Sequence, residues 1–315
     1  MKCDLRGLLG AKLLSFECVM LTNLLSNIPL SPILPFHKGL ERRPEALLSS
    51  ISVTYLGTAG FIFSTPDRNI VVDPYVSRPS LQQHAFSKLI SDDKLVQKII
   101  PQADDVLVGH SHHDHILDAP CLCHQTGARL IGSEDVARVG KAAGIPEEQI
   151  VVTNGREDIS CGPSAMVRGL PSAHGKVYFN RVTLPGNIAP DFKWPSYYWQ
   201  FKHGKVLNWY IETGGLRFLH VDSAEFFADE WRGIEVDVLC LCAIGRAARP
   251  NFIEEAIALT KPKIVMACHW DCFWIPFESS AQYLLPQVDL EGFIKDVEAC
   301  GAQPMVLPIG DTVRI

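Results

Sequence analysis

Six consecutive residues hold most of the metal-binding chemistry of this sequence: His110-Ser111-His112-His113-Asp114-His115. They directly follow the apolar run 105–108, which predicts a strand. Histidines two residues apart cannot share one face of a helix, but a loop at the end of a strand can aim both at one point. A chance match to His-x-His-x-Asp-His in such a chain is on the order of one in a thousand. The motif therefore predicts a metal site.

Three further candidate ligands come after later predicted strands. His174 follows the strand 165–169, Asp222 lies just beyond the strand 216–220, and His269 follows the strand 263–267. A site for two metal ions needs more ligands than one loop supplies. Ligands in layered α/β folds gather where strands end. We therefore expect these three side chains to join the motif at one edge of the sheets.

Short apolar runs rich in β-branched residues, closed by Gly, Pro, Asn or Asp, predict the strands that position these side chains. The runs 52–56, 60–63 and 70–72 predict an antiparallel meander, and further strands are predicted at 105–108, 165–169, 208–212, 216–220, 236–242, 263–267 and 305–308. Helices are predicted at 89–100, 134–143 and 251–260. This mixture favours a layered α/β domain in which helices cover two sheets.

One segment, 178–205, departs from this alternation because it combines aromatic residues with three prolines. Such an insertion can line a binding site, where Tyr197, Tyr198 or His203 would donate a hydrogen bond to a substrate. It can equally be a loop that packs on the domain with its aromatic side chains buried. The sequence leaves both interpretations open.

With these motifs, the sequence resembles the metallo-β-lactamase fold superfamily of metallohydrolases over residues 51–315. The resemblance rests on the His-x-His-x-Asp-His motif, the later His, Asp and His in that order, Asp73-Pro74 closing an early strand, and the terminal Ile309-Gly310-Asp311-Thr312. It implies a four-layer αβ/βα sandwich with metal ions at one edge of two facing sheets. Cys268-His269-Trp270-Asp271, followed by Phe273 and Pro276, resembles the branch of ascorbate-6-phosphate lactonase and N-acylphosphatidylethanolamine phospholipase D more than the antibiotic-cleaving β-lactamases.

The resemblance also implies residue roles. One metal ion would be held by His110, His112 and His174, and the other by Asp114, His115 and His269, with Asp222 bridging the two. Asp73 would accept an N–H from a ligand imidazole and so fix its tautomer, or would simply close a turn. His113 lies inside the motif but not at a ligand position, so we expect it in the pocket wall or behind a ligand.

Imidazoles and carboxylates together suit Zn(II), and also Fe or Mn. Two cations about 3.5–4 Å apart share a water and lower its pKa toward neutrality, which gives a hydroxide nucleophile. Asp114, next to that water, would pass its proton to the leaving group. The resulting hypothesis is a dinuclear hydrolase, with zinc as the first choice of metal, that cleaves a lactone or ester bond of a small molecule.

Three alternatives remain open at this point. The same ligands could cleave a small-molecule or lipid phosphodiester. With iron they could run oxidoreductase chemistry, as the resemblance to flavodiiron proteins and persulfide dioxygenases allows. A third alternative is a metal-binding protein without catalytic activity.

Composition restricts partners and compartment. The 315 residues include 29 Lys plus Arg against 35 Asp plus Glu, a formal charge of −6, so no nucleic-acid partner is expected. The ten cysteines are too scattered for a disulfide framework, and we expect them reduced and buried in a cytoplasmic protein.

Residues 1–50 form a predicted extension to the hydrolase domain, which spans 51–315. A helix near 5–25 and a Pro-rich linker are predicted, the linker packing on the domain or on a second copy in a homo-oligomer. A membrane-surface role for the helix is the less favoured alternative.

Overall fold

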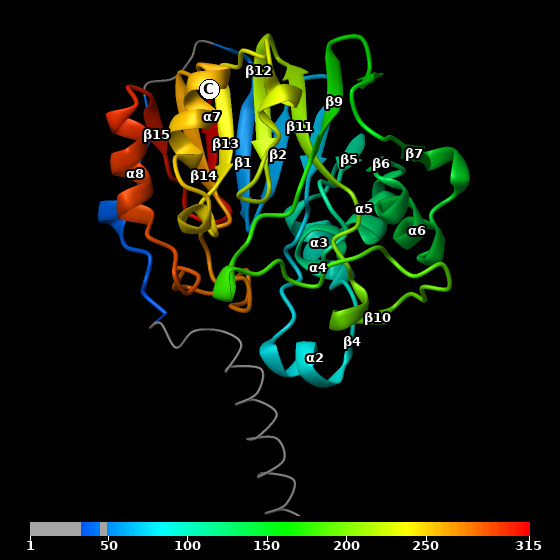
Figure 1. Cartoon of the computed structure of the whole chain (residues 1–315). Coiled ribbons are helices and arrows are strands. Elements are labelled where there is room, and N and C mark those ends of the chain that lie inside the picture. The colour runs from blue at the N-terminus through cyan, green and yellow to red at the C-terminus, as the bar shows by residue number, and fades with distance from the viewer. Residues whose placement is uncertain (1–32, 45–48) are drawn as a thin grey trace, which may run out of the picture.

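The computed structural model describes residues 33–44 and 49–315, and its strands form two seven-stranded sheets (Figure 1). In the first sheet, the antiparallel meander β1–β2–β3 continues into parallel strands. Its strands, in spatial order, are β16 (Thr312–Arg314), β1 (Ser52–Gly57), β2 (Gly60–Ser64), β3 (Asn69–Val72), β5 (Asp105–Leu107), β6 (Arg129–Gly132) and β7 (Ile150–Val152).

The second sheet also combines an antiparallel half with a parallel half. Its strands, in spatial order, are β15 (Gln303–Met305), β14 (Ile264–Cys268), β13 (Val238–Cys242), β12 (Leu216–Val221), β11 (Val206–Thr213), β9 (Ala165–Ser172) and β8 (Asp158–Ser160). A small separate ribbon pairs β10 (Ser196–Tyr197) with β4 (Lys88–Leu89).

Helices cover the outer face of each sheet (Figure 1). The first sheet carries α3 (Asp93–Ile99), α5 (Ala119–Thr126) and α6 (Glu134–Ala142), and the second carries α7 (Phe252–Thr260) and α8 (Leu290–Ala299). Two short helices, α2 (Leu81–Phe86) and α4 (His113–Ile116), lie in the loops. The 3₁₀ turns are η1 (Lys38–Leu40), η2 (Glu147–Gln149), η3 (Tyr178–Asn180), η4 (Tyr198–Gln200), η5 (Ala228–Trp231) and η6 (Arg246–Ala248).

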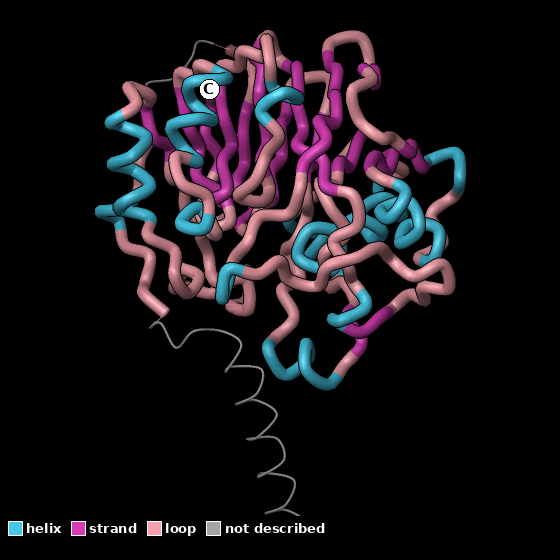
Figure 2. The backbone as a smooth tube through the Cα atoms, viewed as in Figure 1, coloured by secondary structure: helices cyan, strands magenta, loops and turns pink. Residues whose placement is uncertain are grey.

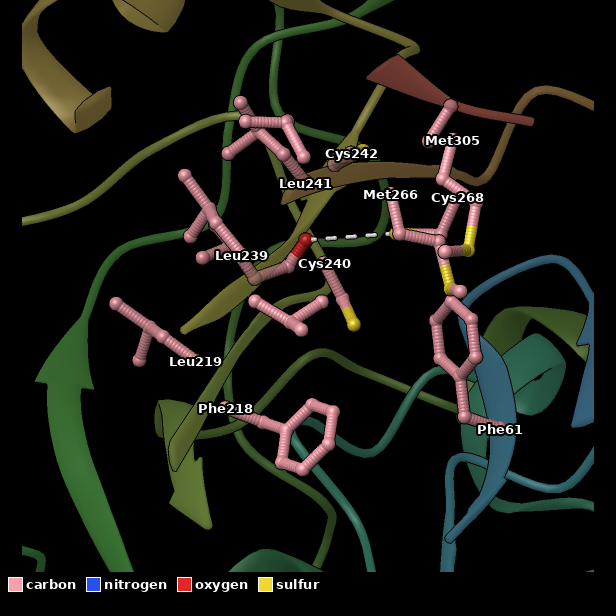
Figure 3. Packing of buried hydrophobic residues seen from close by; sticks show 14 of the residues in the cluster. Phe61, Phe218, Leu219, Leu239, Cys240, Leu241, Cys242, Met266, Cys268 and Met305 are labelled. Atoms are coloured by element: carbon pink, nitrogen blue, oxygen red, sulfur yellow. Dashed lines mark hydrogen bonds between the residues drawn. The ribbon is translucent and has the colours of Figure 1, made fainter. Parts of the chain in front are cut away.

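The main core lies between the two sheets. Phe63 of β2 and Phe218 of β12 meet there with ring centroids 4.8 Å apart. Cys240, Cys242 and Cys268 lie among Met266, Met305 and apolar side chains, and the Cys268 thiol donates to the Val221 carbonyl at 3.7 Å (Figure 3). These cysteines are free thiols that pack as small hydrophobes, as their scattered positions predict. The four-layer arrangement that the family resemblance implies is thereby observed.

Two of the predicted elements that differ from the observed ones have a clear local cause. The helix predicted at 89–100 begins only at Asp93, because the Asp92 side chain accepts the Leu95 N–H and caps it there. The strand predicted at 305–308 is β15, Gln303–Met305, since beyond it the backbone of Val306 pairs with Arg42 instead of the sheet.

The segment 33–44, assigned by sequence to the extension, packs on the domain. Phe36 stacks on Trp270 with centroids 4.5 Å apart, and Leu40 is buried in the main core. The helix predicted at 5–25 lies outside the described residues. Within the described part, no helix is both long and apolar enough to cross a membrane.

Candidate metal centre

The candidate ligands come from loops that gather along the lower edge of both sheets in Figure 2. His110 and His112 leave the end of β5, and the single turn of α4 then carries Asp114 and His115. The other three follow β9, β12 and β14. Since β9, β12 and β14 run in the same direction, their carboxyl ends reach the same edge. All seven predicted ligands are brought together there.

Three overlapping groups of these residues have potential ligand atoms within 4.8 Å of one another. The groups are His110, His112 and His174; Asp114, His115 and His269; and His110, His115 and Asp222. The first two match the sets that the family resemblance assigns to two metal ions. The third shares His110 with the first group and His115 with the second, and it adds Asp222, the residue predicted to bridge the two ions.

In the first group, ring nitrogens of three imidazoles lie close to one another. His110 Nε2 lies 3.0 Å from His112 Nδ1. His174 Nδ1 lies 2.7 Å from the Gly175 carbonyl oxygen, so it carries the proton and donates. This tautomer leaves His174 Nε2 as the free ligand atom.

In the second group, Asp114 lies between two imidazoles. Its Oδ2 is 3.4 Å from His269 Nε2 and 3.7 Å from His115 Nε2. His115 Nδ1 donates to Asp73 Oδ2 at 2.9 Å, which leaves Nε2 for a metal ion. Asp73 Oδ1 in turn accepts the Gly109 N–H at 2.7 Å. Asp73 thus holds both the ligand imidazole and the strand end that precedes the motif.

The donor set fits divalent cations. Asp73, Asp114 and Asp222 are all buried, and Asp222 Oδ1 has no hydrogen-bond partner. Buried carboxylates in such number call for positive charge nearby, because desolvated anions are costly unless they are paired. His110, His112 and His174 would hold one ion, and Asp114, His115 and His269 the other.

Burial sets the protonation of the first group. It holds the pKa of His110 and of His112 well below the usual value, and it lowers the pKa of His174 to about 4. All three imidazoles are therefore neutral near pH 7, which is the form that binds metal ions.

In the second group, contacts between charged side chains determine the protonation states. Burial alone would raise the pKa of Asp114, but His115, His113 and His269 outweigh it and hold that pKa well below its usual range. Burial likewise opposes the charged form of His115, yet Asp114 and Asp73 raise its pKa to about 9. Without a metal ion, the His115 imidazolium thus supplies part of the positive charge that the carboxylates require.

A cavity of about 270 Å³ opens over these ligands. His113 and Tyr198 form part of its wall, with ring centroids 5.0 Å apart. His203 stacks beside His174 at 5.7 Å but does not line this cavity, and Tyr197 stacks on Trp199 away from it. Of the three predicted substrate contacts, the structure thus places Tyr198 alone on the cavity wall.

Two residues of the site were not predicted from the sequence. His84 of α2 has its Nε2 2.9 Å from His113 Nε2, and Gly109 lies so close to Asp222 that a Cβ would come within 2.2 Å of Oδ2. The only sequence signal for Gly109 is its place between a strand and the motif. His84 has no local signal, because its partner comes from a different loop.

The family model described as the beta-lactamase superfamily domain matches residues 52–269. The chain belongs to the metallo-β-lactamase superfamily. Among similar members is a protein from Anaeromyxobacter sp. (strain K) named a UPF0173 metal-dependent hydrolase, which is 34% identical over 241 residues. That match covers 73% of this chain and 78% of the relative.

Solved structures of other proteins share the fold. Igni18, a metallo hydrolase from Ignicoccus hospitalis, superposes with a TM-score of 0.53 at 20% identity, over 84% of this chain and 97% of that one. A possible metal-dependent hydrolase from Veillonella parvula gives a TM-score of 0.55 at 12% identity, over 85% and 100%. At such identities the likeness concerns the fold.

Proposed function

We propose that this chain is a metal-dependent hydrolase that uses two divalent metal ions, zinc as the first choice, to cleave an ester or lactone bond. The observation that carries the proposal is the convergence of seven candidate ligands in three overlapping groups, in which all but the half-buried His174 are buried: His110, His112, Asp114, His115, His174, Asp222 and His269. The relatives that bear the name metal-dependent hydrolase support the same reaction class.

The bound ions would supply a hydroxide nucleophile from water at neutral pH and would offset the charge that develops on the substrate oxygen. Asp114 supplies the proton transfer. Its Oδ2 faces His115 and His269, while its Oδ1 is the oxygen nearer His113, at 3.5 Å from Nδ1. An ionised carboxylate with one oxygen turned away from the ligands can accept a proton and pass it to a leaving group.

The residue types that line the cavity favour a substrate that reacts at an acyl carbon rather than at phosphorus. Sites that transfer phosphoryl groups commonly place Arg or Lys against the non-bridging oxygens. Among the described residues that line this cavity, none is Arg or Lys. Phosphodiester cleavage is the alternative, and parallel assays of an aryl ester and an aryl phosphodiester decide between them.

The test is to remove and restore the metal ions. Chelation is expected to abolish ester hydrolysis, and adding back Zn(II), Fe(II) or Mn(II) is expected to restore it. The Asp114→Asn variant, in which one ligand charge and the proton carrier are lost, is expected to fall by at least about 100-fold in kcat. Full activity after complete chelation would contradict the proposal, and oxygen consumption by an iron form without hydrolysis would support an oxidoreductase instead.

A further inference from the structure

The cavity wall away from the ligands is made of apolar side chains. Leu81 comes from α2, Val177 directly precedes the segment 178–205 and Leu184 lies within it, Ile244 comes from the loop after β13, and Phe273 and Leu285 from the segment after β14. No cationic side chain of the described residues reaches this wall. The charged groups of the cavity are therefore those of the candidate metal centre. The rest of the wall is mostly apolar, and its hydroxyl groups include those of Thr183, Tyr178 and Tyr198.

Several of the polar residues in the wall are engaged with the protein. Ser223 Oγ accepts the Gly175 N–H at 2.8 Å, and the Tyr178 hydroxyl donates to the Pro286 carbonyl at 3.4 Å. Both ring nitrogens of His84 are in contact, one with the Ser80 carbonyl and one with His113. These groups contribute little that would hold an ionic substituent of a ligand.

Exposed apolar side chains also lie next to lining residues in the sequence. Phe179 directly follows the lining residue Tyr178 and is 58% exposed. Phe86 is 44% exposed and ends α2, the helix that begins with Leu81. The pairing of β10 with β4 brings the chain just after α2 beside residues 196–197 at the lower edge of the molecule (Figure 1). Exposed apolar side chains next to residues that line a cavity favour a binding surface there.

We propose that the substrate is an uncharged ester or lactone whose acyl part is an unbranched hydrocarbon chain, with that chain against the apolar wall and its carbonyl at the metal-binding end. This proposal rests on the proposed function. The cavity, about 270 Å³, lies near the lower limit of ligand pockets, so a chain of moderate length fills it and a longer chain would extend toward the exposed Phe179.

The first experiment compares p-nitrophenyl esters with the metal-loaded full chain. From acetate to hexanoate, kcat/KM is expected to rise about four-fold for each CH₂ group that becomes buried. The adipate monoester matches the hexanoate but ends in a carboxylate, and it is expected to be at least about ten-fold poorer because that charge would face hydrocarbon. Equal rates for all chain lengths, or a preference for the adipate monoester, would overturn the proposal.

A charge placed in the wall provides the matched variant. Leu81→Lys puts an ammonium at the cavity end of α2, and it is expected to reduce the preference for hexanoate over adipate monoester by about ten-fold. Gln82→Lys adds the same charge one residue along the same helix, at an exposed position that does not line the cavity, and is expected to keep the original preference. If both variants changed the preference for hexanoate over adipate monoester equally, the apolar cavity wall would not be what determines that preference.

Calorimetric binding separates this inference from the proposed function. Hexanamide and adipic acid monoamide are matched ligands that the full chain would cleave slowly. Tighter binding of hexanamide with no hydrolysis of any ester would support the apolar wall and refute the hydrolase. Ester hydrolysis with equal or tighter binding of the charged amide would leave the hydrolase standing and refute the apolar substrate.

Discussion

Gly109 lies where the chain leaves β5 and enters the ligand loop. Its N–H donates to Asp73, its carbonyl accepts the Leu207 N–H, and its missing side chain leaves space that Asp222 Oδ2 occupies. A Cβ at this position would lie 2.2 Å from that oxygen, closer than nonbonded atoms approach. The missing side chain at Gly109 therefore allows the Asp222 carboxylate to occupy its position between the two ligand groups.

Gly109→Ala is expected to displace Asp222 and to lower ester hydrolysis by at least about ten-fold, an effect of the size that small misplacements in active sites produce. The bound metal per chain should fall with it. Gly127→Ala is a matched control, since nothing lies within 4 Å of a Cβ there, although its positive φ strains any side chain. Wild-type activity in Gly109→Ala would show that Asp222 is not constrained in this way.

The candidate ligands could be foreseen from the sequence because their types are rare and their spacing is specific. His110 to His115 share one loop, so the motif itself holds most of the information. The neighbours that position them could not be foreseen. The contact of His84 with His113 and the space that Gly109 leaves for Asp222 arise only when separate loops meet in the fold.

The segment after β14 places His269 through a buried ion pair. His269 has a positive φ of 53°, and its N–H donates to the Thr58 carbonyl at 2.5 Å. Two residues later, Asp271 accepts the Thr58 N–H and the Tyr55 hydroxyl, each at 2.6 Å, and pairs with Arg78 at 2.7 Å. Arg78 and Asp271 are both almost fully buried. These contacts tie the His269 turn to the β1–β2 hairpin.

Asp271→Ala would leave the Arg78 guanidinium buried without its partner. The expected loss in free energy of unfolding is about 3–5 kcal/mol, the usual cost of breaking a buried pair from one side. Denaturant titration measures it. The exposed pair of Lys261 and Glu235 is the control, and Glu235→Ala should leave the free energy of unfolding nearly unchanged. Similar losses for both variants would contradict this account of the turn.

At the scale of elements, the apolar runs predicted the central strands well, since β1, β2, β3 and β12 differ from their predicted bounds by a residue or so. Helix α8 was not predicted. It contains Gly292 and two β-branched residues, which weaken helix propensity, and its formation depends on Leu290, Phe293 and Val297 packing on the second sheet. Such tertiary contacts are not local properties of a sequence.

Across the whole molecule, buried histidines make stability depend on pH. In the metal-free protein, burial lowers the pKa of His174 to about 4 and that of His113 to about 3. The same groups have a pKa of about 6.5 when the chain is unfolded. Below that value the unfolded chain binds more protons than the folded one, so stability falls as the pH falls. His115, whose pKa is raised to about 9, acts in the opposite direction.

The metal-free protein is therefore expected to lose stability between pH 6.5 and 4, by about 1.4 kcal/mol per pH unit for each fully buried neutral histidine. The contribution of His115 is present below pH 6.5 and is lost as the pH rises through about 9, so a shallower decline is expected on the alkaline side. Urea unfolding midpoints of chelated protein at several pH values measure both limbs. A flat profile from pH 7 to 4.5 would contradict these assignments.

The central claim is that the buried histidines and aspartates hold metal ions on which hydrolysis depends. The most direct measurement is the metal content of the purified full chain, determined alongside ester hydrolysis before and after chelation. Close to two divalent ions per chain are expected, lost together with activity on chelation and regained together on reconstitution. A chain with no bound metal that hydrolyses esters at an undiminished rate would contradict this role of the metal ions.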